Sequence, residues 1–446
     1  MTGLFLGADL GTSGLKVVAL DPDGGLVAEA EAGYAIDRPA PGHAEIDVRV
    51  WRRALDGALT ELAVALPRAP VRSLGFSGQM HGAVLVGDDG RALRPALLWP
   101  DSRAAAELDR WRALGAAHRA ALANPLVPGM TGPLLAWLAR HEPATVERAA
   151  AVLLPKDALR AALVPGSAAV TDRSDASATL LWDVPADDWS AAAVAAAGVA
   201  PRLLPAVRPG SAVVGTARLP VGEVPVVVGA ADTPLALLGA GSTAGLQVNL
   251  GTGAQVLRPR WAPRAVADPV VHGYADADGG WYAMAALQNG GSAWAWVCDV
   301  LGLPWRELFD AAASVPDAGG AVFRPFLTGE RGGVAAPEQR AGWDGLHPGT
   351  TRAHLARAAV EGVVRAVGAA AALLEPPDED APVVLTGGGV RAPLVQQLLA
   401  DVLLRPVRAV RLRSASAVGA AQLGARGAGV DVVPRRAAGP VVDPRG

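Results

Sequence analysis

The loop Gly11-Thr12-Ser13-Gly14 carries residue types suited to binding a phosphate group. Its glycines let backbone N–H groups approach phosphate oxygens closely, and its two hydroxyls add further donors. Lys16 follows and adds a compact positive charge, while Asp9 precedes the loop and is suited to holding Mg²⁺ through water. An ordinary hairpin turn beside a solvated aspartate is the alternative interpretation.

A second loop, Gly251-Thr252-Gly253, repeats this pattern in the other half of the chain. In both places an apolar run, with a polar residue two positions before the first glycine, ends in a Gly-Thr turn. This separation suits a duplicated fold in which two hairpin loops face one cleft.

Three consecutive glycines, Gly387-Gly388-Gly389, lie between a predicted strand and a predicted helix. Because they have no side chains, they leave an opening in which a flat adenine ring could lie. On this motif alone, a tight strand-to-helix turn is the favoured interpretation.

Asp232 is the candidate for proton transfer. It follows an apolar run in Gly229-Ala-Ala-Asp232-Thr233, which places it at the mouth of a sheet, where ligands bind in open α/β folds. A partly desolvated carboxylate at such a point can accept the proton of an attacking hydroxyl. Locally, an aspartate that caps a helix is an equally good interpretation.

The segment Ser77-Gly-Gln79-Met80-His81-Gly82 concentrates hydrogen-bonding groups between two glycines, as a loop that binds a polyol would. Trp99 could lay its ring along a sugar. A histidine with purely structural hydrogen bonds and a tryptophan packed in the core are the alternatives.

Hydropathy patterning predicts the elements that must position these residues. Apolar runs bounded by turn residues predict strands at 4–9, 15–20, 26–32, 71–76, 82–86, 224–228 and 381–386. Helical spacing predicts helices at 51–65, 352–374 and 393–404. Residues 104–200 are predicted to be mainly helical with interruptions at 124–131 and 154–157, and residues 201–225 to be a connecting segment. The fold class is therefore α/β.

Length and composition exclude several classes of protein. The chain has 446 residues, 51% of them hydrophobic, which allows two or three domains. The net charge is −3 and no basic stripe is visible, so nucleic acid is not an expected partner. The single cysteine, Cys298, excludes a disulfide framework and a cysteine-rich zinc site within one chain. Lysine occurs only at Lys16 and Lys156, and a requirement for a compact ammonium group is one interpretation of each position.

No membrane segment is expected. The N-terminal residues lack the basic region of a signal peptide, and an acid interrupts their apolar run. The most apolar later stretch, residues 224–239, is broken by Asp232 and Pro234 and is shorter than the ~20 residues that a membrane span needs. A cytoplasmic protein is therefore predicted.

Taken in order, these motifs resemble those of the FGGY family of carbohydrate kinases over residues 3–425. Any one motif is weak, but the ordered set is specific. Its pieces are Asp9–Gly14, Ser77–Gly82, Leu98–Arg103, Pro128–Thr131, Leu153–Asp157, Gly229–Asp232, Gly251–Gly253, Gly329–Arg331 and Gly387–Gly389. Within the family, Gln-Met-His-Gly followed by Leu-Pro-Lys-Asp points to the members that phosphorylate D-xylulose.

The resemblance implies two domains of the actin-like ATPase (ribonuclease H-like) fold with a catalytic cleft between them. The expected domains are a sugar-binding domain at residues 1–236 and a nucleotide-binding domain at residues 237–446. The implied substrates are ATP, with Mg²⁺, and a ketose phosphorylated at its terminal hydroxyl. Neither nucleic acid nor a membrane is an implied partner, and a homodimer is left open.

The resemblance also assigns roles by motif position. Asp232 matches the catalytic base, and Asp9 matches the acid near the metal. The sugar-binding positions are Gln79, Met80, His81, Trp99 and Thr233. The nucleotide-binding positions are Thr12, Ser13, Lys16, Gly251, Thr252, Gly291, Gly388 and Gly389.

Four departures from the family pattern leave alternatives open. Thr233 stands where an asparagine is usual, Pro100 stands between Trp99 and Asp101, Gly332-Gly333 replaces Thr-Pro, and residues 427–446 lack the usual final helix. One alternative is a kinase for ribulose, gluconate, sedoheptulose, glycerol or erythritol. The other is a non-catalytic nucleotide-binding protein of the actin-like fold.

Overall fold

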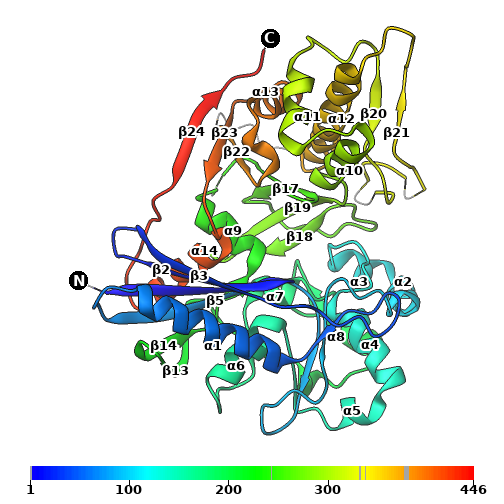
Figure 1. Cartoon of the computed structure of the whole chain (residues 1–446). Coiled ribbons are helices and arrows are strands. Elements are labelled where there is room, and N and C mark those ends of the chain that lie inside the picture. The colour runs from blue at the N-terminus through cyan, green and yellow to red at the C-terminus, as the bar shows by residue number, and fades with distance from the viewer. Residues whose placement is uncertain (1–2, 243, 331–332, 337, 376–380, 446) are drawn as a thin grey trace.

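The computed structural model describes residues 3–242, 244–330, 333–336, 338–375 and 381–445. These residues form two halves, which lie one above the other in Figure 1. Each half is built around a seven-stranded mixed sheet. The combination of mixed sheets and covering helices confirms the predicted α/β class.

The first sheet comes from the N-terminal half and has the strand order β13-β14-β5-β1-β2-β3, with β15 paired to β5. β1 is antiparallel to β2 and parallel to β5, so that Asp9 lies beside Ser77 in the register. The strands are β1 Leu4–Leu10, β2 Gly14–Leu20, β3 Leu26–Gly33, β5 Val71–Gly78, β13 Val213–Leu219, β14 Gly222–Val227 and β15 Ala230–Ala231.

The second sheet has the order β18-β19-β17-β16-β22-β23-β24. Its strands are β16 Gln247–Leu250, β17 Ala254–Pro259, β18 His272–Ala275, β19 Trp281–Leu287, β22 Val383–Thr386, β23 Val407–Arg411 and β24 Ala437–Val442. β16 is antiparallel to β17 and parallel to β22, which repeats the relation of β1 to β2 and β5. The two predicted Gly-Thr turns are therefore equivalent hairpin turns, one in each sheet.

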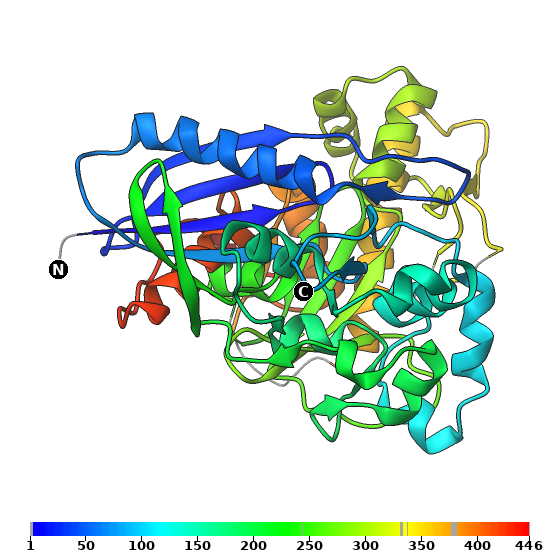
Figure 2. The ribbon, with the colours of Figure 1, turned by 90° about the horizontal axis from the view of Figure 1, so that it is seen from below.

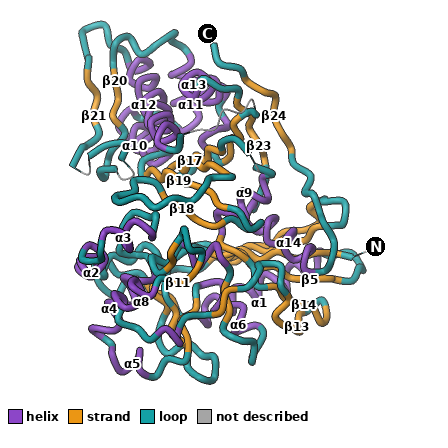
Figure 3. Tube along the Cα trace, turned by 180° about the vertical axis from the view of Figure 1, so that it is seen from behind, coloured by secondary structure: helices purple, strands orange, loops and turns teal. Residues whose placement is uncertain are grey.

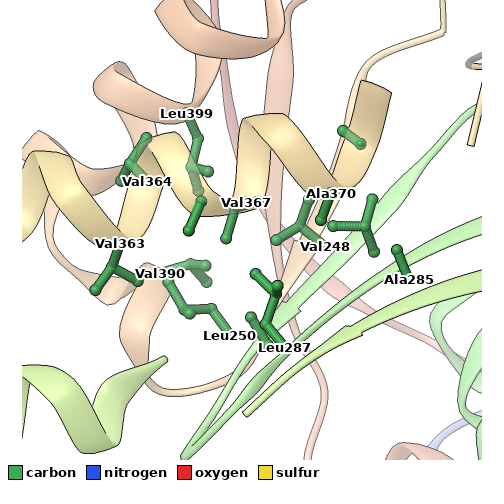
Figure 4. Close-up of a cluster of buried hydrophobic side chains, with 14 of the residues drawn as sticks. Val248, Leu250, Ala285, Leu287, Val363, Val364, Val367, Ala370, Val390 and Leu399 are labelled. Atoms are coloured by element: carbon green, nitrogen blue, oxygen red, sulfur yellow. The ribbon is translucent and has the colours of Figure 1, made fainter. Parts of the chain in front are cut away.

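Amphipathic helices cover the two sheets. In the first half, α1 (Val48–Ala65) buries Trp51, Leu55 and Leu59 and packs against β2 and β3. In the second half, α12 (Arg352–Leu373) packs against β17 and β19, with α10 (Gly291–Leu301), α11 (Trp305–Ala313) and α13 (Pro393–Leu403) around it. Figure 4 shows Val363 and Val367 of α12 gathered with Leu250 and Leu287 of the sheet.

Two helices of small residues lie between the sheets in Figure 1, namely α9 (Asp232–Ala240) and α14 (Ala415–Gly427). α14 packs on α9, β1 and β5, and its backbone lies close to the backbone of β1. A Cβ at Gly7 of β1 would lie 1.9 Å from the carbonyl oxygen of Ala417, so only glycine allows this approach. The proposed domain boundary between residues 236 and 237 lies inside α9.

Residues 80–207 form a group of short elements to one side of the first sheet (Figure 2). The helices predicted here are confirmed but short: α2 Leu108–Arg112, α3 Ala116–Ala121, α4 Thr131–His141, α5 Pro143–Glu147, α6 Pro155–Leu163, α7 Arg173–Ser177 and α8 Ala191–Ala197. Two-stranded pairs join them: β4 (Glu45–Ile46) with β7 (Ala96–Leu97), β6 (Val84–Val86) with β8 (Ala151–Leu153), β9 (Val170–Thr171) with β12 (Ala206–Val207), and β10 (Trp182–Asp183) with β11 (Asp188–Trp189).

Two predictions of local structure were wrong. The interruption predicted at 154–157 lies earlier, at residues 148–154, where β8 separates α5 from α6. Pro155 begins α6, where its missing N–H costs nothing. Residues 201–225 are not only a connection, because they contain β13 and the first residues of β14, which pair as a hairpin at the edge of the first sheet. Glycine and proline at strand edges and turns produced the misleading composition.

The C-terminal residues form a strand instead of a helix. β24 pairs with β23 at the edge of the second sheet, along the outer side of the molecule in Figure 3. Before it, the Arg436 guanidinium donates hydrogen bonds to the carbonyls of Gly239 and Leu238 at the end of α9. The remaining paired strands are β20 (Val322–Arg324) and β21 (Gly342–Asp344). None of the helices in the described ranges is long and apolar enough to cross a bilayer.

Candidate active site

Asp232 is the first residue of α9 and lies at the edge of the first sheet where β1, β5 and β15 end. β15, immediately before it, pairs with Ser77 and Gly78 at the end of β5. The helix cap is Ala231, which makes no side-chain cap bond, so the local alternative of Asp232 as a capping residue is wrong. Its carboxylate is partly buried and accepts a hydrogen bond from the Thr233 hydroxyl at 3.2 Å.

Asp9 and Asp232 interact electrostatically although they come from different parts of the chain. Burial and the negative charge of Asp9 raise the pKa of Asp232 to about 7. Burial also raises the pKa of Asp9, against a hydrogen bond of 2.7 Å from Ser77 Oγ and the positive charge of Lys16. A carboxyl whose pKa lies near neutrality is suited to accepting a proton.

The loop of residues 11–14 is held from its carbonyl side. The Tyr34 hydroxyl donates to the Gly11 and Gly14 carbonyls at 2.6 and 3.2 Å, and Gln79 Nε2 donates to the Gly11 carbonyl at 3.1 Å. Gln79 is buried, and Ser13 is exposed. Lys16 is partly exposed, with its Nζ 3.8 Å from Glu31 Oε2.

Met80 and His81 lie at the end of β5, where His81 adopts a left-handed backbone with φ of 65°. Its Nδ1 is 2.5 Å from the Ala178 carbonyl oxygen, and burial lowers its pKa to about 4. The ring is therefore neutral near pH 7, and with Nδ1–H as the donor to Ala178, Nε2 is an acceptor.

Two tyrosines from the second sheet complete this region, and neither was identified from the sequence. Tyr282 of β19 is fully buried, and its hydroxyl is 3.7 Å from Met80 Sδ. It also interacts with the Thr233 hydroxyl and with the charge of Asp232. The Tyr274 ring of β18 is centred 6.0 Å from the His81 ring. The only sequence signal was an apolar strand pattern, which indicates burial and no particular partner.

Trp99 is 42% exposed, so the alternative of plain core packing is wrong. Its indole Nε1 donates a hydrogen bond of 3.0 Å to Thr12 Oγ1 in the loop of residues 11–14. The predicted sugar residue and the predicted phosphate loop are therefore in direct contact.

The second hairpin turn is tied to the start of α10. The Gly291 N–H donates to the Gly251 carbonyl at 2.9 Å, and the Ser292 N–H donates to the Thr252 carbonyl at 2.9 Å. Gly251 and Thr252 are exposed, whereas Gly291 is buried. The Gly251 N–H is itself bonded to the Gly253 carbonyl at 3.0 Å, and the first N–H groups of α10 donate to carbonyls of the turn, so the turn leaves Thr252 at an exposed position.

The triple glycine follows β22 and combines close packing with an open surface. A Cβ at Gly389 would lie 2.7 Å from Leu250 Cγ, so Gly389 brings this segment against the end of β16. A Cβ at Gly388 would have no neighbour within 4 Å. Gly388 therefore faces open space, as a position that contacts a flat ring would.

A cleft of about 1180 Å³ joins the two halves. Its walls include Lys16 and Glu31 from the first sheet, and Gly387, Gly388 and Arg391 from the second half. It exceeds the ~300–1,000 Å³ of typical small-molecule sites, so it has room for a nucleotide. The predicted sugar residues do not line this cleft. They lie at the ends of β5 and β15 and in the loop that carries Trp99. Of the residues predicted to bind the nucleotide or to act in catalysis, only Lys16 and Gly388 line the cleft, and Asp9, Asp232 and the loop of residues 11–14 do not.

Glu330 belongs to the predicted Gly329–Arg331 motif, of which Arg331 lies outside the described residues together with Gly332. The Glu330 carboxylate is buried and accepts the N–H groups of Gln288 and Asn289 at 2.8 and 3.3 Å. Glu330 therefore holds the loop that leads into α10.

The described residues contain no group of three or more His, Cys, Asp or Glu side chains placed to hold a metal ion. Mg²⁺ in kinases needs no such cage, because it keeps several waters and binds through one or two carboxylates and the phosphates of the nucleotide. The charge of Asp9 raises the pKa of Asp232, an effect that a divalent cation beside the two carboxylates would relieve. The residues present therefore fit Mg²⁺.

The two halves match two family models. Residues 4–239 match the N-terminal domain, and residues 246–428 the C-terminal domain, of the FGGY family of carbohydrate kinases. Among curated proteins, the chain is 34% identical to the xylulose kinase of Escherichia coli over 420 residues, covering 90% of this chain and 84% of the relative. It is 36% identical to the xylulose kinase of Streptomyces rubiginosus over 461 aligned positions, covering 99% and 92%.

Solved structures give the same result. A xyloylose kinase from Brucella ovis superimposes with a TM-score of 0.90 at 31% identity, covering 99% of this chain and 95% of that one. A glycerol kinase from Plasmodium falciparum, at 18% identity and a TM-score of 0.85, shares the fold.

Proposed function

The chain belongs to the FGGY family of carbohydrate kinases, and we propose that it transfers the γ-phosphate of ATP to the terminal hydroxyl of D-xylulose. Family membership makes it an ATP-dependent sugar kinase of the actin-like ATPase fold, which removes the non-catalytic alternative. The relatives described as xylulose kinases support D-xylulose as the sugar, as do the Gln-Met-His-Gly and Leu-Pro-Lys-Asp motifs.

The observation that carries the proposed chemistry is the position and pKa of Asp232. It starts α9 at the edge where β5 and β15 end, with a pKa of about 7. In the proposed step, Asp232 orients the sugar hydroxyl and accepts its proton, the hydroxyl oxygen forms a bond to the γ-phosphorus, and the bond to the β-phosphate oxygen breaks to release ADP. Because the transition state for phosphoryl transfer is loose, positioning contributes more than basicity.

We assign the surrounding residues by the group each would contact. Thr12, Ser13 and Lys16 from one hairpin, and Gly251 and Thr252 from the other, would bind the phosphates through N–H groups, hydroxyls and the ammonium group. Gly291, Gly388 and Gly389 would contact the rest of the nucleotide. Gln79, Met80, His81, Trp99 and Thr233 would form or support the sugar site.

Asp9 and the phosphates would hold Mg²⁺, with waters completing its coordination. Bound there, Mg²⁺ would neutralise charge on the phosphates. Residues 1–236 would then bind the sugar and residues 237–446 the nucleotide, with the two domains together excluding water from the γ-phosphate.

A second sugar is the runner-up, and Thr233 is the observation that favours it. A threonine hydroxyl supplies fewer hydrogen-bonding groups than the asparagine amide usual at this position. Tyr282 interacts with the same hydroxyl, so fewer hydrogen bonds from Thr233 are left for a substrate.

The test is a coupled assay that detects ADP, with MgATP and a panel of sugars. The panel comprises D-xylulose, ribulose, gluconate, sedoheptulose, glycerol and erythritol. We expect the highest kcat/KM for D-xylulose, and no sugar-dependent ADP with Asp232→Asn. A higher kcat/KM for another member of the panel would replace the proposed substrate, and sugar-dependent turnover by Asp232→Asn near the wild-type rate would remove the proposed base.

A further inference from the structure

A cluster of five ionisable side chains is buried in the first half, beside the segment that leads to Asp232. Lys156 Nζ is 2.7 Å from Asp157, 3.0 Å from Asp172 and 3.0 Å from Asp175. Arg160 pairs with Asp157 at 2.6 Å. Burial opposes the charge of Lys156, but its carboxylate neighbours raise its pKa, so it stays an ammonium ion. We call these five residues the Lys156 cluster.

The cluster reaches the backbone next to Asp232 through one serine. Asp172 accepts a short hydrogen bond from the Ser174 hydroxyl. Ser174 Oγ in turn accepts the backbone N–H of Ala231 at 2.9 Å. Ala231 is the residue before Asp232 and the cap of α9, and its own side chain offers no cap bond. The chain of contacts therefore runs from Lys156 through Asp172 and Ser174 to the peptide that leads into Asp232.

The same cluster holds the other end of this segment. Arg160 Nη1 donates to the Val228 carbonyl at 2.6 Å, three residues before Ala231. Between these two points, β15 pairs with β5. Every partner in this set is nearly or fully buried, so water cannot replace a lost bond.

We propose that Ser174 is a positioning residue for the phosphoryl transfer: its hydroxyl, oriented by Asp172 and Lys156, fixes the peptide from which the Asp232 carboxylate projects. A buried charged cluster costs desolvation energy that apolar packing would not, so a contribution to the stability of the fold does not by itself explain the Lys156 cluster. Fixing the backbone that carries the Asp232 carboxylate is a better explanation, because displacement of a reacting group by about 1 Å can cost ~100-fold in rate.

The α7 helix supplies a matched control, since Ser177 makes the same kind of bond in another direction. Ser177 Oγ accepts the backbone N–H of Ala275 in β18 at 2.9 Å, and both serines are buried. Ser174→Ala and Ser177→Ala each leave one buried N–H without this acceptor. Ser174→Ala also removes a donor to the buried Asp172 carboxylate, whereas Ser177→Ala removes a donor to the Ser174 carbonyl, so we expect the larger fall in Tm for Ser174→Ala and compare kcat at a temperature where both variants are folded. Only Ser174→Ala removes the bond to the segment that carries Asp232.

The experiment measures kcat, both KM values and Tm for the two variants with MgATP and the most active sugar of the panel. We expect Ser174→Ala to lower kcat about 10- to 100-fold with the KM for ATP unchanged, and Ser177→Ala to keep kcat within about twofold. Equal kcat values in folded Ser174→Ala and folded Ser177→Ala, whether near the wild-type kcat or far below it, would overturn the proposal.

Ser174→Cys is the second variant, because it is close in size and keeps a weak acceptor. We expect its kcat to lie between those of Ser174→Ala and the wild type, and a kcat at or below that of Ser174→Ala would contradict the role of the hydroxyl. If Ser174→Ala does not fold, the kcat of Ser174→Cys is compared with that of Ser177→Ala. A kcat of Ser174→Cys equal to or above that of Ser177→Ala would then overturn the proposal. The proposal rests on Asp232 as the base, which Asp232→Asn tests separately: an active Asp232→Asn removes the proposed function, whereas an inactive one with a fully active Ser174→Ala removes only this inference.

Discussion

The indole nitrogen of Trp99 donates a 3.0 Å hydrogen bond to the hydroxyl of Thr12, 87 residues earlier in the chain. This bond joins the residue expected to pack on the sugar to the loop expected to hold the phosphates. The sugar and ATP would therefore each contact one member of a hydrogen-bonded pair, Trp99 and Thr12.

A double-mutant cycle on this pair tests that connection. Trp99→Phe keeps a ring and removes the donor, and Thr12→Val keeps the shape and removes the acceptor. Because a net hydrogen bond contributes about 0.5–1.5 kcal/mol, we expect each change to lower kcat/KM for ATP about 2- to 10-fold. The double variant should lose little more than either single variant, since both remove the same bond. Fully additive losses would show that the bond is not used during turnover.

The pH dependence of turnover should report the pKa of Asp232. A base must be deprotonated, so kcat/KM for the sugar should rise with pH through about 7 and level off above it. Asp9→Asn removes one of the two causes of the raised pKa, and the acid limb of its residual activity should move to lower pH. An unchanged midpoint in Asp9→Asn would mean that the two carboxylates do not interact.

Asp232→Asn should be more stable than the wild type, in a pH-dependent way. The pKa of this carboxyl is about 7 in the folded protein and near its ordinary 3.8 in the unfolded chain. The wild type therefore loses stability as pH rises from about 4 to about 7, because the unfolded chain releases its proton more readily. Asparagine has no such cost. Urea unfolding at pH 5 and 8 should show a larger advantage of Asp232→Asn at pH 8, and the opposite order would contradict the raised pKa.

His81→Asn tests the sugar site without straining the backbone. Asparagine tolerates a φ of 65° better than alanine does, so the loop should keep its shape. If Nε2 binds a sugar hydroxyl as proposed, loss of the ring should raise the KM for the sugar about 10-fold, as for one hydrogen bond, and leave the KM for ATP within about twofold. Equal rises in both KM values would place His81 outside the sugar site.

Gly388→Ala separates nucleotide binding from folding. The added methyl meets no atom within 4 Å and the φ of −70° suits alanine, so Tm should not fall. If a ring lies against this glycine, overpacking should raise the KM for ATP about 10-fold. Gly389→Ala is the contrasting variant, because its methyl would lie 2.7 Å from Leu250 Cγ, and we expect it to lower Tm. An unchanged KM for ATP in Gly388→Ala would remove this glycine from the nucleotide site.

Local chemistry was sufficient to predict much of the fold. Alternating apolar runs with turn residues predicted both hairpins, and helical spacing predicted α1, α12 and α13, because these patterns depend on neighbours in the chain. The edge hairpin of β13 and β14 was missed because prolines and glycines there resemble those of a loop. Its pairing partner β5 lies far away in the sequence.

The sequence alone determined which residues have the chemistry of a kinase: two Gly-Thr turns, two aspartates at strand ends and a polar loop after β5. Only the tertiary structure decided their environment. Burial beside Asp9 brings the pKa of Asp232 near neutrality, and packing of the second sheet places Tyr282 against Met80 and Thr233. It also turned Lys156, a candidate for function by its rarity, into the centre of a buried cluster. The physical reason is that desolvation and Coulomb interactions depend on distance in space, which the order of residues does not specify.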